Sequence, residues 1–244
     1  MNRRADLVLV QRGFFESRNK ARAAIEAGLA SVDGVVILKP ADLVNPDGKI
    51  EAVAPHPWVS RAGLKLEAGL ELFHIDPRGK TCLDIGASTG GFTQVLLTRG
   101  AARVYAVDVG REQLHPSLRE DTRVVSMETC DARSLDAAMF EAPLDLIVCD
   151  ASFISLKLAL PKPLELAAPG ADLIALIKPQ FEAGRERVGK GGIVRDPDVH
   201  YDVCVDIRGF LGASGWRVLG LEPSPISGSD GNREFLIAAR KNAL

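Results

Sequence analysis

Two strand-like segments of this sequence end in residues that can handle protons. The segment ADLIALIKPQFEAG contains an apolar run that ends in Lys178, with a proline directly after it, and the run LDLIVCD ends in Asp150. In an open α/β sheet, reactive groups gather outside the carboxyl ends of the strands. We therefore expect Lys178 and Asp150 to share one crevice, where a lysine can act as a base or stabilise negative charge. A strand-end lysine can also be a plain surface residue that leaves the sheet.

A glycine-rich turn is the second chemical feature. LDIGASTGGFTQVLL runs from a strand into a helix: Gly86 permits a sharp turn, and Gly90 and Gly91 let a ligand approach the main chain. Acids follow two later strands, and Asp108 could accept hydrogen bonds from ribose hydroxyls while Asp131 could hold an adenine amino group. Either acid alone could instead cap a helix. The pattern predicts a nucleotide-type pocket, although its spacing lacks the second glycine of G-x-G-x-x-G, which weakens the competing interpretation as an NAD dehydrogenase.

The elements that must position these residues alternate between strand and helix. Several of the predicted strands are continuous apolar runs, which is typical of a sheet covered on both faces. This pattern predicts a doubly wound, Rossmann-like α/β sheet over residues 61–244. The predicted strands are 81–86, 103–109, 124–127, 144–150, 172–178, 216–222 and 234–240.

The first 54 residues have a different character. We expect one helix with Leu7 and Val10 in the core, and a second helix that starts at Ser17 and stops at Gly28. Short β segments follow, with a turn at 33–34, and then two prolines within 55–57 that indicate a linker. The second helix would turn three residues inward: Ala21, Ala24 and Ile25.

The start of the chain is locally basic. Residues 1–22 carry six cations against the two anions Asp6 and Glu16. Such a face could meet RNA phosphates, although a solvated charged helix is the plainer interpretation. The cations that we expect to bind RNA are Arg3, Arg4, Arg18, Lys20 and Arg22.

The bulk composition limits the class of protein. With 244 residues and 46% apolar residues the chain can build a large core, and a net charge of −2 argues against a protein that coats nucleic acid as a whole. The four cysteines lack the spacing of a zinc site, so we expect no metal and reduced core thiols. We identify no signal peptide and no segment near the roughly 20 apolar residues of a membrane span. A cytoplasmic protein without a membrane partner is expected.

At this point the sequence resembles a known family. Lys65, Asp150, Lys178 and Glu234 match, in order and context, the Lys-Asp-Lys-Glu tetrad of the FtsJ-like ribose 2′-O-methyltransferases. The phrases SRAGLKL, DIGASTGGFT, VCDASF, ALIKPQFE and GNREFLI fit that family over most of residues 60–240. The segment RADLVLVQRGFFESRNKARAAIEAGLASVDGVVILKP resembles the S-four-type RNA-binding module. The fusion is similar to the TlyA family, often labelled hemolysin A, which methylates cytidine riboses in ribosomal RNA.

The resemblance implies a fold, a cofactor and a partner. It implies a small α+β RNA-binding domain over 1–54, a linker over 55–60, and a methyltransferase domain over 61–244 whose sheet is mostly parallel with one antiparallel strand. The implied partner is ribosomal RNA within ribosomal subunits, and the oligomeric state stays open. The implied cofactor is S-adenosylmethionine, and the residues expected to bind it are Asp84, Gly86, Ser88, Gly90, Gly91, Phe92, Asp108, Asp131 and Asp150.

The role of the tetrad lysine is open at this stage. A ribose hydroxyl is a very weak acid, so it must be positioned and its proton must leave. If Lys178 is neutral when substrate binds, it is a general base; if it is charged, it orients the hydroxyl and stabilises developing negative charge. Our hypothesis is the base role, with Asp150 and Glu234 orienting the lysines. Lys65 lies between two leucines, so periodicity alone lets it point either way.

Other functions remain as alternatives. Methylation of a base amino group usually shows Asn/Asp-Pro-Pro-aromatic where this chain has Asp150-Ala-Ser-Phe, and a cytosine-carbon methyltransferase would need a nucleophile such as Cys149. A catalytically silent RNA-binding or assembly factor and, less favoured, a membrane-active hemolysin are also considered. The cationic loop 185–196 could close over cofactor or RNA or be inert, and Trp58 could couple the domains or belong to a core.

Overall fold

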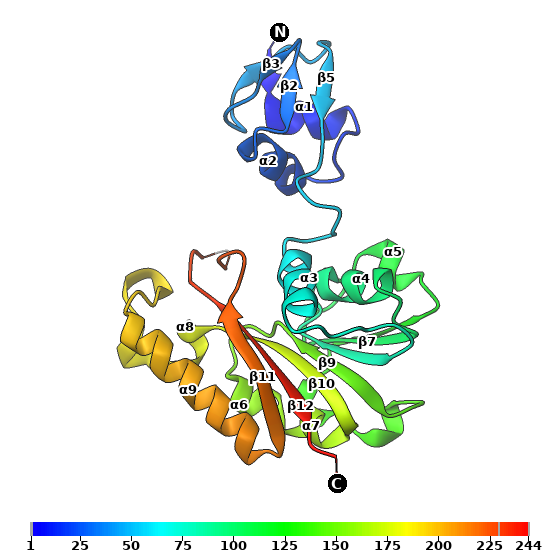
Figure 1. Cartoon of the computed structure of the whole chain (residues 1–244). Helices are drawn as coiled ribbons and strands as arrows, with labels where there is room; N and C mark the ends of the chain where they lie inside the picture. The colour runs from blue at the N-terminus through cyan, green and yellow to red at the C-terminus, as the bar shows by residue number, and fades with distance from the viewer. Residues whose placement is uncertain (1, 229, 244) are drawn as a thin grey trace. The chain divides into compact units, whose positions relative to one another are not determined.

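The chain forms two compact units. The computed structural model describes residues 2–228 and 230–243, and the described residues divide between Pro57 and Trp58 into an N-terminal unit and a C-terminal unit (Figure 1). Each unit has its own apolar core.

The N-terminal unit is a small α+β fold. Strands β3, β2 and β5 form one antiparallel sheet, and β1 pairs with β4. Two helices pack against each other beside them. The elements in chain order are β1 (Arg3–Arg4), α1 (Ala5–Gln11), α2 (Arg18–Glu26), β2 (Ala30–Val32), β3 (Val35–Val36), β4 (Leu43–Val44) and β5 (Ile50–Ala52).

The second predicted helix is confirmed. The Ser17 hydroxyl caps α2 by accepting a hydrogen bond from the Lys20 amide at 3.3 Å, and Ala21, Ala24 and Ile25 are buried as expected. The turn between β2 and β3 has positive φ at both residues 33 and 34, as a two-residue hairpin loop requires.

The predicted core face of the first helix is wrong. The structure buries Val8 and Leu9, while Leu7 and Val10 are only partly buried. The helix begins directly after β1, at Ala5, and Ala5 is buried. The helical period then places the buried face at Val8 and Leu9, one residue away from the face that the apolar pattern indicated. Asp6 is buried on this helix as well, which no apolar pattern could predict.

The C-terminal unit is a seven-stranded sheet with helices on both faces. The strand order is β11-β12-β10-β9-β6-β7-β8, and β12 alone runs antiparallel to its neighbours (Figure 1). This confirms the predicted doubly wound sheet, its seven strands and its one antiparallel strand. The strands are β6 (Thr81–Ile85), β7 (Arg103–Asp108), β8 (Val124–Glu128), β9 (Leu144–Cys149), β10 (Ala167–Ile177), β11 (Trp216–Pro223) and β12 (Phe235–Lys241).

Helices cover the two faces of this sheet. Helices α3 and α4 pack on one face, and α6, α7 and α9 pack on the other. Neighbouring strand residues alternate between the two cores, as Cys82 and Leu83 do, which explains why the strands read as continuous apolar runs. The helices are α3 (Ala62–Leu72), α4 (Gly91–Thr98), α5 (Pro116–Arg119), η1 (Ala132–Ser134), η2 (Ala137–Met139), α6 (Leu156–Ala159), α7 (Pro161–Leu166), α8 (Pro179–Glu182), η3 (Arg185–Arg187), η4 (Lys190–Gly192) and α9 (Pro197–Ala213).

The direction of β12 matters for the site. Because β12 is antiparallel to β10, its first residue, Phe235, pairs with Ile177, the last residue of β10. The start of β12 therefore lies at the edge where the parallel strands end. Glu234, which directly precedes β12, is thereby brought to the same edge as Asp150 and Lys178.

Candidate active site

Four charged side chains meet at the carboxyl edge of the sheet. Lys178 Nζ lies 2.6 Å from Asp150 Oδ1, and Lys65 Nζ lies 2.6 Å from Glu234 Oε2 and 3.8 Å from Asp150 Oδ2. Lys65, Lys178 and Glu234 are each less than 10% exposed. Two cations and two anions balance in formal charge, which is the condition under which such groups tolerate burial. Asp150 contacts both lysines and so links the two pairs.

Helix α3 turns Lys65 inward, which decides the orientation that the sequence left open. The helix approaches the sheet closely at Gly69, where a Cβ atom would lie 3.2 Å from the Ile174 side chain. The small residue lets α3 settle on β10 and β12, and Lys65, one turn earlier, then reaches over the sheet edge to Glu234.

Lys178 is surrounded by oxygen atoms. Its Nζ donates hydrogen bonds to the Asp150 carbonyl at 2.9 Å and to the Ser152 hydroxyl at 2.8 Å, in addition to the ion pair with the Asp150 carboxylate. An ammonium group has three N–H donors and no acceptor. The position of Lys178 is therefore defined by three oxygens that all belong to the segment after β9. The sequence did not single out Ser152.

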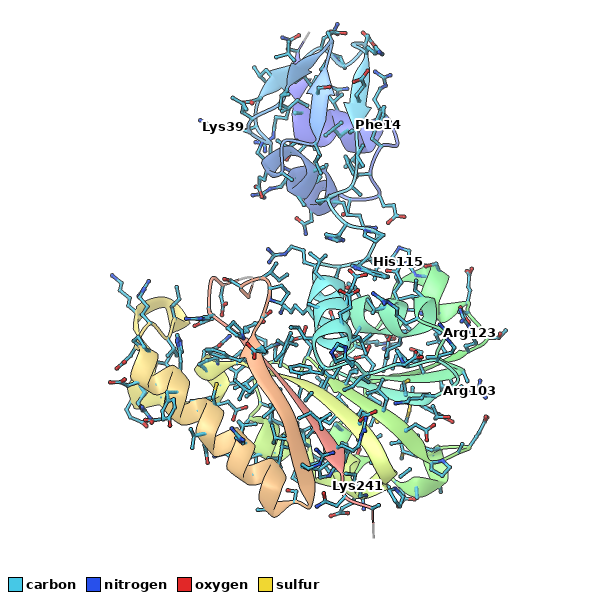
Figure 2. The ribbon with its side chains drawn as sticks, in the orientation of Figure 1. Phe14, Lys39, Arg103, His115, Arg123 and Lys241 are labelled. Carbon is cyan, nitrogen blue, oxygen red and sulfur yellow. The ribbon has the colours of Figure 1, made fainter. Side chains whose placement is uncertain are left out.

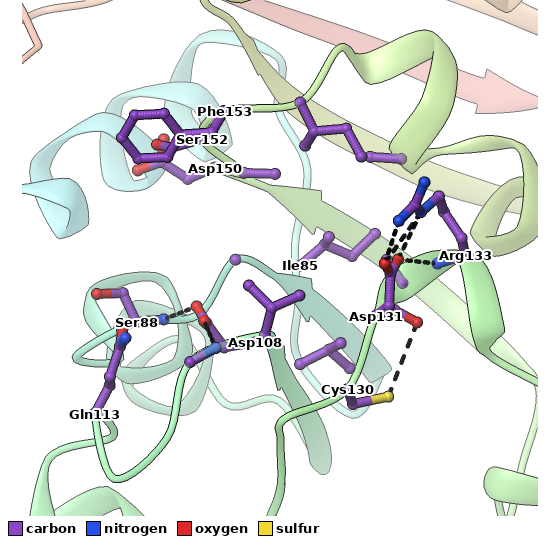
Figure 3. Close-up of a pocket in the computed structure, with 18 residues that line it drawn as sticks. Ile85, Ser88, Asp108, Gln113, Cys130, Asp131, Arg133, Asp150, Ser152 and Phe153 are labelled. Atoms are coloured by element: carbon purple, nitrogen blue, oxygen red, sulfur yellow. Dashed lines mark hydrogen bonds and ion pairs between the residues drawn. The ribbon is translucent and has the colours of Figure 1, made fainter.

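A pocket of about 600 Å³ opens beside this cluster (Figure 3). It lies at the ends of β6, β7, β8 and β9, which is where a doubly wound sheet binds nucleotides. Of the residues predicted to bind a cofactor, five line it: Gly86, Ser88, Asp108, Asp131 and Asp150.

The two acids at the ends of later strands shape this pocket through their own hydrogen bonds. Asp108 accepts from the Ser88 amide at 2.8 Å and from the Gly110 amide at 2.7 Å, so it ties two pocket loops together. Asp131 both caps η1 and pairs with Arg133 at 2.6 Å, and the Arg133 guanidinium lowers the pKa of this carboxyl. The helix-cap interpretation of Asp131 is thus correct as far as it goes, and the same residue also faces the pocket.

The other predicted cofactor residues lie behind the pocket rather than on its lining. Phe92 is buried in the core between α4 and the sheet. A Cβ atom at Gly90 would lie 2.3 Å from the Leu118 side chain, and one at Gly91 would lie 2.2 Å from the Ser60 hydroxyl. Protein atoms fill the space where a Cβ atom would lie at these two glycines, so packing alone favours glycine there, and their contact with a cofactor stays a prediction.

Asp84 is fully buried beneath the glycine turn. Its Oδ2 accepts a hydrogen bond from the Thr93 hydroxyl at 2.6 Å, and within the part of the chain that the structure describes its Oδ1 has no hydrogen-bond partner. Burial raises the pKa of this carboxyl to about 7. A buried acid without a neighbouring cation is an unusual feature, and a positively charged ligand close by would favour its ionised form.

Sequence reasoning missed several pocket residues. Gln113 and Arg133 line the pocket from segments without a motif of their own. The loop that carries Gln113 is held by Glu128 at the end of β8, whose carboxylate accepts hydrogen bonds from the amides of residues 112–114. The backbone amide of Leu114 contributes most to lowering the pKa of Glu128. The signal in the sequence that could have revealed this loop is Glu128 itself, a lone acid at the end of a predicted strand.

The pocket suits S-adenosylmethionine on chemical grounds. This cofactor carries a ribose, an adenine amino group, a sulfonium cation and a zwitterionic amino acid end. Asp108 could accept hydrogen bonds from ribose hydroxyls and Asp131 from an amino group. Behind the pocket lining, the buried Asp84 carboxyl would be favoured in its ionised form by the positive charge of the sulfonium. When bound, the cofactor supplies a methyl group on a sulfonium, an electrophile that needs no metal.

Two alternative chemistries fit less well. Cys149 is fully buried in β9, and burial raises the pKa of its thiol to about 12, so it is not placed as a nucleophile. Among the described residues, no group of three or more histidine, cysteine or acidic side chains is arranged to hold a metal ion.

The predicted RNA-binding cations form an ordered surface on the N-terminal unit. Asp6 is completely buried and pairs with Arg4 at 3.0 Å and with Arg18 at 2.8 Å, and both arginine side chains stay about half exposed. Lys20 on α2 pairs with Glu16, which precedes the helix, and a guanidinium nitrogen of Arg22 lies 3.9 Å from Glu26 Oε1. The remaining predicted cation, Arg3, is exposed and donates to Gln11, and Lys39 adds a further exposed cation to this unit (Figure 2).

The structure also places the two features left open by the sequence. Trp58 is buried in the C-terminal unit, where its indole donates to Glu67 and packs against Gly63, so it belongs to a core. The loop 185–196 is anchored by Asn232, which is fully buried, accepts from the Val194 amide and donates to the Gly192 carbonyl.

Comparison with known proteins agrees with this geometry. The model of the FtsJ-like methyltransferase family matches residues 58–241, and the S4 domain model matches residues 3–50. The chain is 48% identical to a candidate rRNA methyltransferase, YqxC, of Bacillus subtilis (strain 168), over 96% of this chain and 84% of that protein. It is 44% identical to the 16S/23S rRNA (cytidine-2′-O)-methyltransferase TlyA of Mycobacterium tuberculosis (strain ATCC 25618 / H37Rv), over 97% of this chain and 89% of the relative.

A solved structure is similar over nearly the whole chain. It is described as a candidate hemolysin from Streptococcus thermophilus, with 41% identity, a TM-score of 0.79, and coverage of 99% of this chain and 89% of that one. The chain therefore belongs to the FtsJ-like methyltransferases, and its cofactor is S-adenosylmethionine. Within that class it is a member of the TlyA/hemolysin A family, with an S4 domain ahead of the methyltransferase domain. No helix among the described residues is long and apolar enough to cross a membrane.

Proposed function

We propose that this protein transfers a methyl group from S-adenosylmethionine to a ribose 2′-hydroxyl of ribosomal RNA, with cytidine as the target nucleoside and a ribosomal subunit as the substrate. The observation that carries the proposal is the buried cluster of Lys65, Asp150, Lys178 and Glu234 beside the cofactor pocket. The names of similar proteins support ribosomal RNA and the cytidine 2′-oxygen as the acceptor.

Each residue of the cluster has its own role in this proposal. Lys178 receives the proton of the ribose hydroxyl, and Asp150 holds the lysine in place through its carboxylate and its carbonyl. Glu234 fixes Lys65, whose positive charge next to Asp150 stabilises negative charge that develops on the acceptor oxygen. Because all four groups are positioned before substrate binds, little reorganisation is needed during the reaction.

The N-terminal unit binds ribosomal RNA in this proposal. Arg4 and Arg18 are oriented by the buried Asp6 and leave about half of each side chain exposed for phosphate contacts, together with Arg3, Lys20 and Arg22. Such contacts give affinity and position more than sequence choice, so the target is selected through the folded shape of the RNA. A structured subunit is therefore the expected substrate rather than a short oligonucleotide.

The test is transfer of labelled methyl groups to purified, unmodified small and large ribosomal subunits. The wild-type protein is compared with Lys178→Ala and with the control Lys157→Ala, which removes a surface lysine of α6 that pairs with Asp206. Label in ribose with the wild type and the control, and its loss in Lys178→Ala, is the expected result. Absence of transfer by a protein that still binds cofactor would favour a silent RNA-binding or assembly role.

A further inference from the structure

Ser152 stands between the cofactor pocket and the proposed base. Its side chain is exposed and lines the pocket, whereas Lys178 is 6% exposed and does not belong to the pocket lining. The two are joined directly, since the Ser152 Oγ atom lies 2.8 Å from Lys178 Nζ. Figure 3 shows Ser152 beside Asp150 and Phe153 at one side of the pocket.

The segment that carries Ser152 is held from two sides. On one side the turn at Gly86 packs against the Ala151 backbone, where a Cβ atom would come within 2.8 Å of Cα. On the other side, Phe153 adopts a positive φ of 64°, and the centroid of its ring lies 5.2 Å from that of the Phe181 ring. A non-glycine residue in this region is strained and persists only where its surroundings hold it. Phe153 itself is 90% exposed, so the Gly86 contact and the hydrogen bond to Lys178 are what hold the Ser152 hydroxyl in place.

The same segment is anchored farther along by Glu182. This carboxylate accepts from the Ser155 hydroxyl at 2.5 Å and from the Leu156 amide at 2.8 Å. Glu182 follows Lys178 by four residues, so the segment that carries Ser152 and the segment that carries the lysine are bonded to each other. Neither can move far without the other.

A hydroxyl is the one partner of Lys178 that can work in both directions. It can accept a hydrogen bond from an ammonium, and it can donate one to the lone pair of a neutral amine. The other two oxygens near Nζ, both from Asp150, can only accept while the carboxylate is ionised. Of these three described oxygens, only that of the Ser152 hydroxyl can therefore pass a proton on to the lysine.

We propose that Ser152 is a further catalytic residue, which relays the proton of the acceptor ribose hydroxyl to Lys178. The 2′-hydroxyl gives its proton to Ser152 Oγ as the hydroxyl proton of Ser152 passes to neutral Lys178 Nζ. The 2′-oxygen keeps the electron pair of its O–H bond and uses it to bond the methyl carbon, as the carbon–sulfur bond breaks and leaves its electron pair on the sulfur of the departing S-adenosylhomocysteine. Ser152 ends the step as a hydroxyl, and Lys178 ends it as an ammonium. The relay rests on the proposed function, because it requires a hydroxyl acceptor.

The test compares three variants of the full-length protein in single-turnover methyl transfer to ribosomal subunits. Ser152→Ala removes the relay, Ser152→Thr restores a hydroxyl, and Ser214→Ala is the control, which removes an exposed hydroxyl at the end of α9 that donates to the Phe210 carbonyl. General acid–base groups contribute roughly 10²–10⁴-fold, so we expect at least a 100-fold loss in Ser152→Ala. Ser152→Thr and Ser214→Ala should stay within about fivefold of the wild type. Cofactor affinity should be unchanged in all three.

A further readout separates a relay from a structural role. In mixtures of light and heavy water, two protons moving together should give a curved dependence of the wild-type rate on deuterium content.

The outcomes are distinct. Full rate in Ser152→Ala, or a linear deuterium dependence in an active wild type, would overturn the relay and leave the proposed function intact. Failure of the unaltered protein to methylate ribose on either subunit would overturn the proposed function and the relay with it.

Discussion

The two edges of the central sheet each carry an aspartate that lies between two cations. At the carboxyl edge, Asp150 lies between Lys178 and Lys65; at the amino edge, the buried Asp172 lies between Lys80, at 2.8 Å, and Arg240, at 2.7 Å. Both acids thus have two cationic partners. The partners of Asp172 are 27% and 44% exposed, whereas those of Asp150 are both 8% exposed.

The comparison separates stability from chemistry. The amino-edge cations are open to water, and their ion pairs join the ends of three strands. The carboxyl-edge lysines are withdrawn from water beside a pocket, where a proton can be moved and charge is weakly screened. Under the proposed function, the cluster at the amino edge serves stability and the cluster at the carboxyl edge serves catalysis.

The largest expected effect is at the carboxyl edge. Asp150→Asn removes the charge that holds both lysines, and we expect methyl transfer to fall about 1,000-fold. The free energy of unfolding should also fall, by about 3 kcal/mol, because two buried lysines lose their shared acid. Single-turnover methyl transfer and urea denaturation measure the two quantities. A folded variant that keeps its rate within about tenfold of the wild type would erase the contrast between the edges.

The corresponding substitution at the amino edge should lower stability and leave methyl transfer nearly unchanged. Asp172→Asn leaves two cations without their acid, and we expect the free energy of unfolding to fall by about 2 kcal/mol, less than for a fully buried pair because both partners reach water. Methyl transfer should stay within about twofold at a temperature where the variant is folded. Asp206→Asn, which breaks the surface pair with Lys157, is the control and should cost at most about 0.5 kcal/mol.

A third acid sharpens the comparison. Asp84 is buried near the carboxyl edge of the sheet, and its described hydrogen-bond partner is the Thr93 hydroxyl rather than a cation. Its pKa of about 7 means that the carboxyl is half protonated near pH 7 in the cofactor-free protein. A cationic cofactor favours the ionised form, so binding should release a proton below pH 7. We expect cofactor affinity to rise with pH by up to about tenfold per unit below pH 7 and to level off above it. Calorimetry in two buffers tests this, and Asp84→Asn should abolish the slope.

The smallest expected effect on methyl transfer comes from Asp6 in the N-terminal unit, because its contribution to stability changes only at low pH. The side-chain hydrogen bond from Arg4 contributes most to lowering the pKa of Asp6 to about 2. An acid with a lowered pKa in the folded state stabilises the fold above its unfolded-state value, near 3.9, and this contribution fades as the pH falls through about 2. Asp6→Asn should remove that pH dependence. NMR amide signals of the unit, followed from pH 5 to pH 2, would contradict this if both proteins lost them in parallel.

Most of the fold was predictable because apolar runs and turn residues are local signals. All seven strands of the C-terminal sheet follow from apolar segments, several of them continuous, and α2 follows from Ser17 and Gly28. The face of α1 was not predictable, because β1 fixes where the helix begins and a buried aspartate lies on its inner side.

The site was predictable only in part. Strand ends place Asp150 and Lys178 together by topology alone, since adjacent parallel strands end at one edge. The direction of Lys65 depends on how closely α3 approaches β10, which involves residues more than 100 positions apart. Ser152 and Gln113 were missed because their importance comes from contacts with Lys178 and Glu128, not from their own type or spacing.

The single reversed strand has a consequence for how such enzymes diversify. Because β12 runs against its neighbours, the connection from β11 to β12 crosses the reactive edge and ends directly at Glu234. Insertions or deletions in that connection change what is presented to a macromolecular substrate, while the strand pairing that fixes the glutamate stays in register. A change in that connection can thus alter which RNA reaches the proposed site without displacing Glu234 from it.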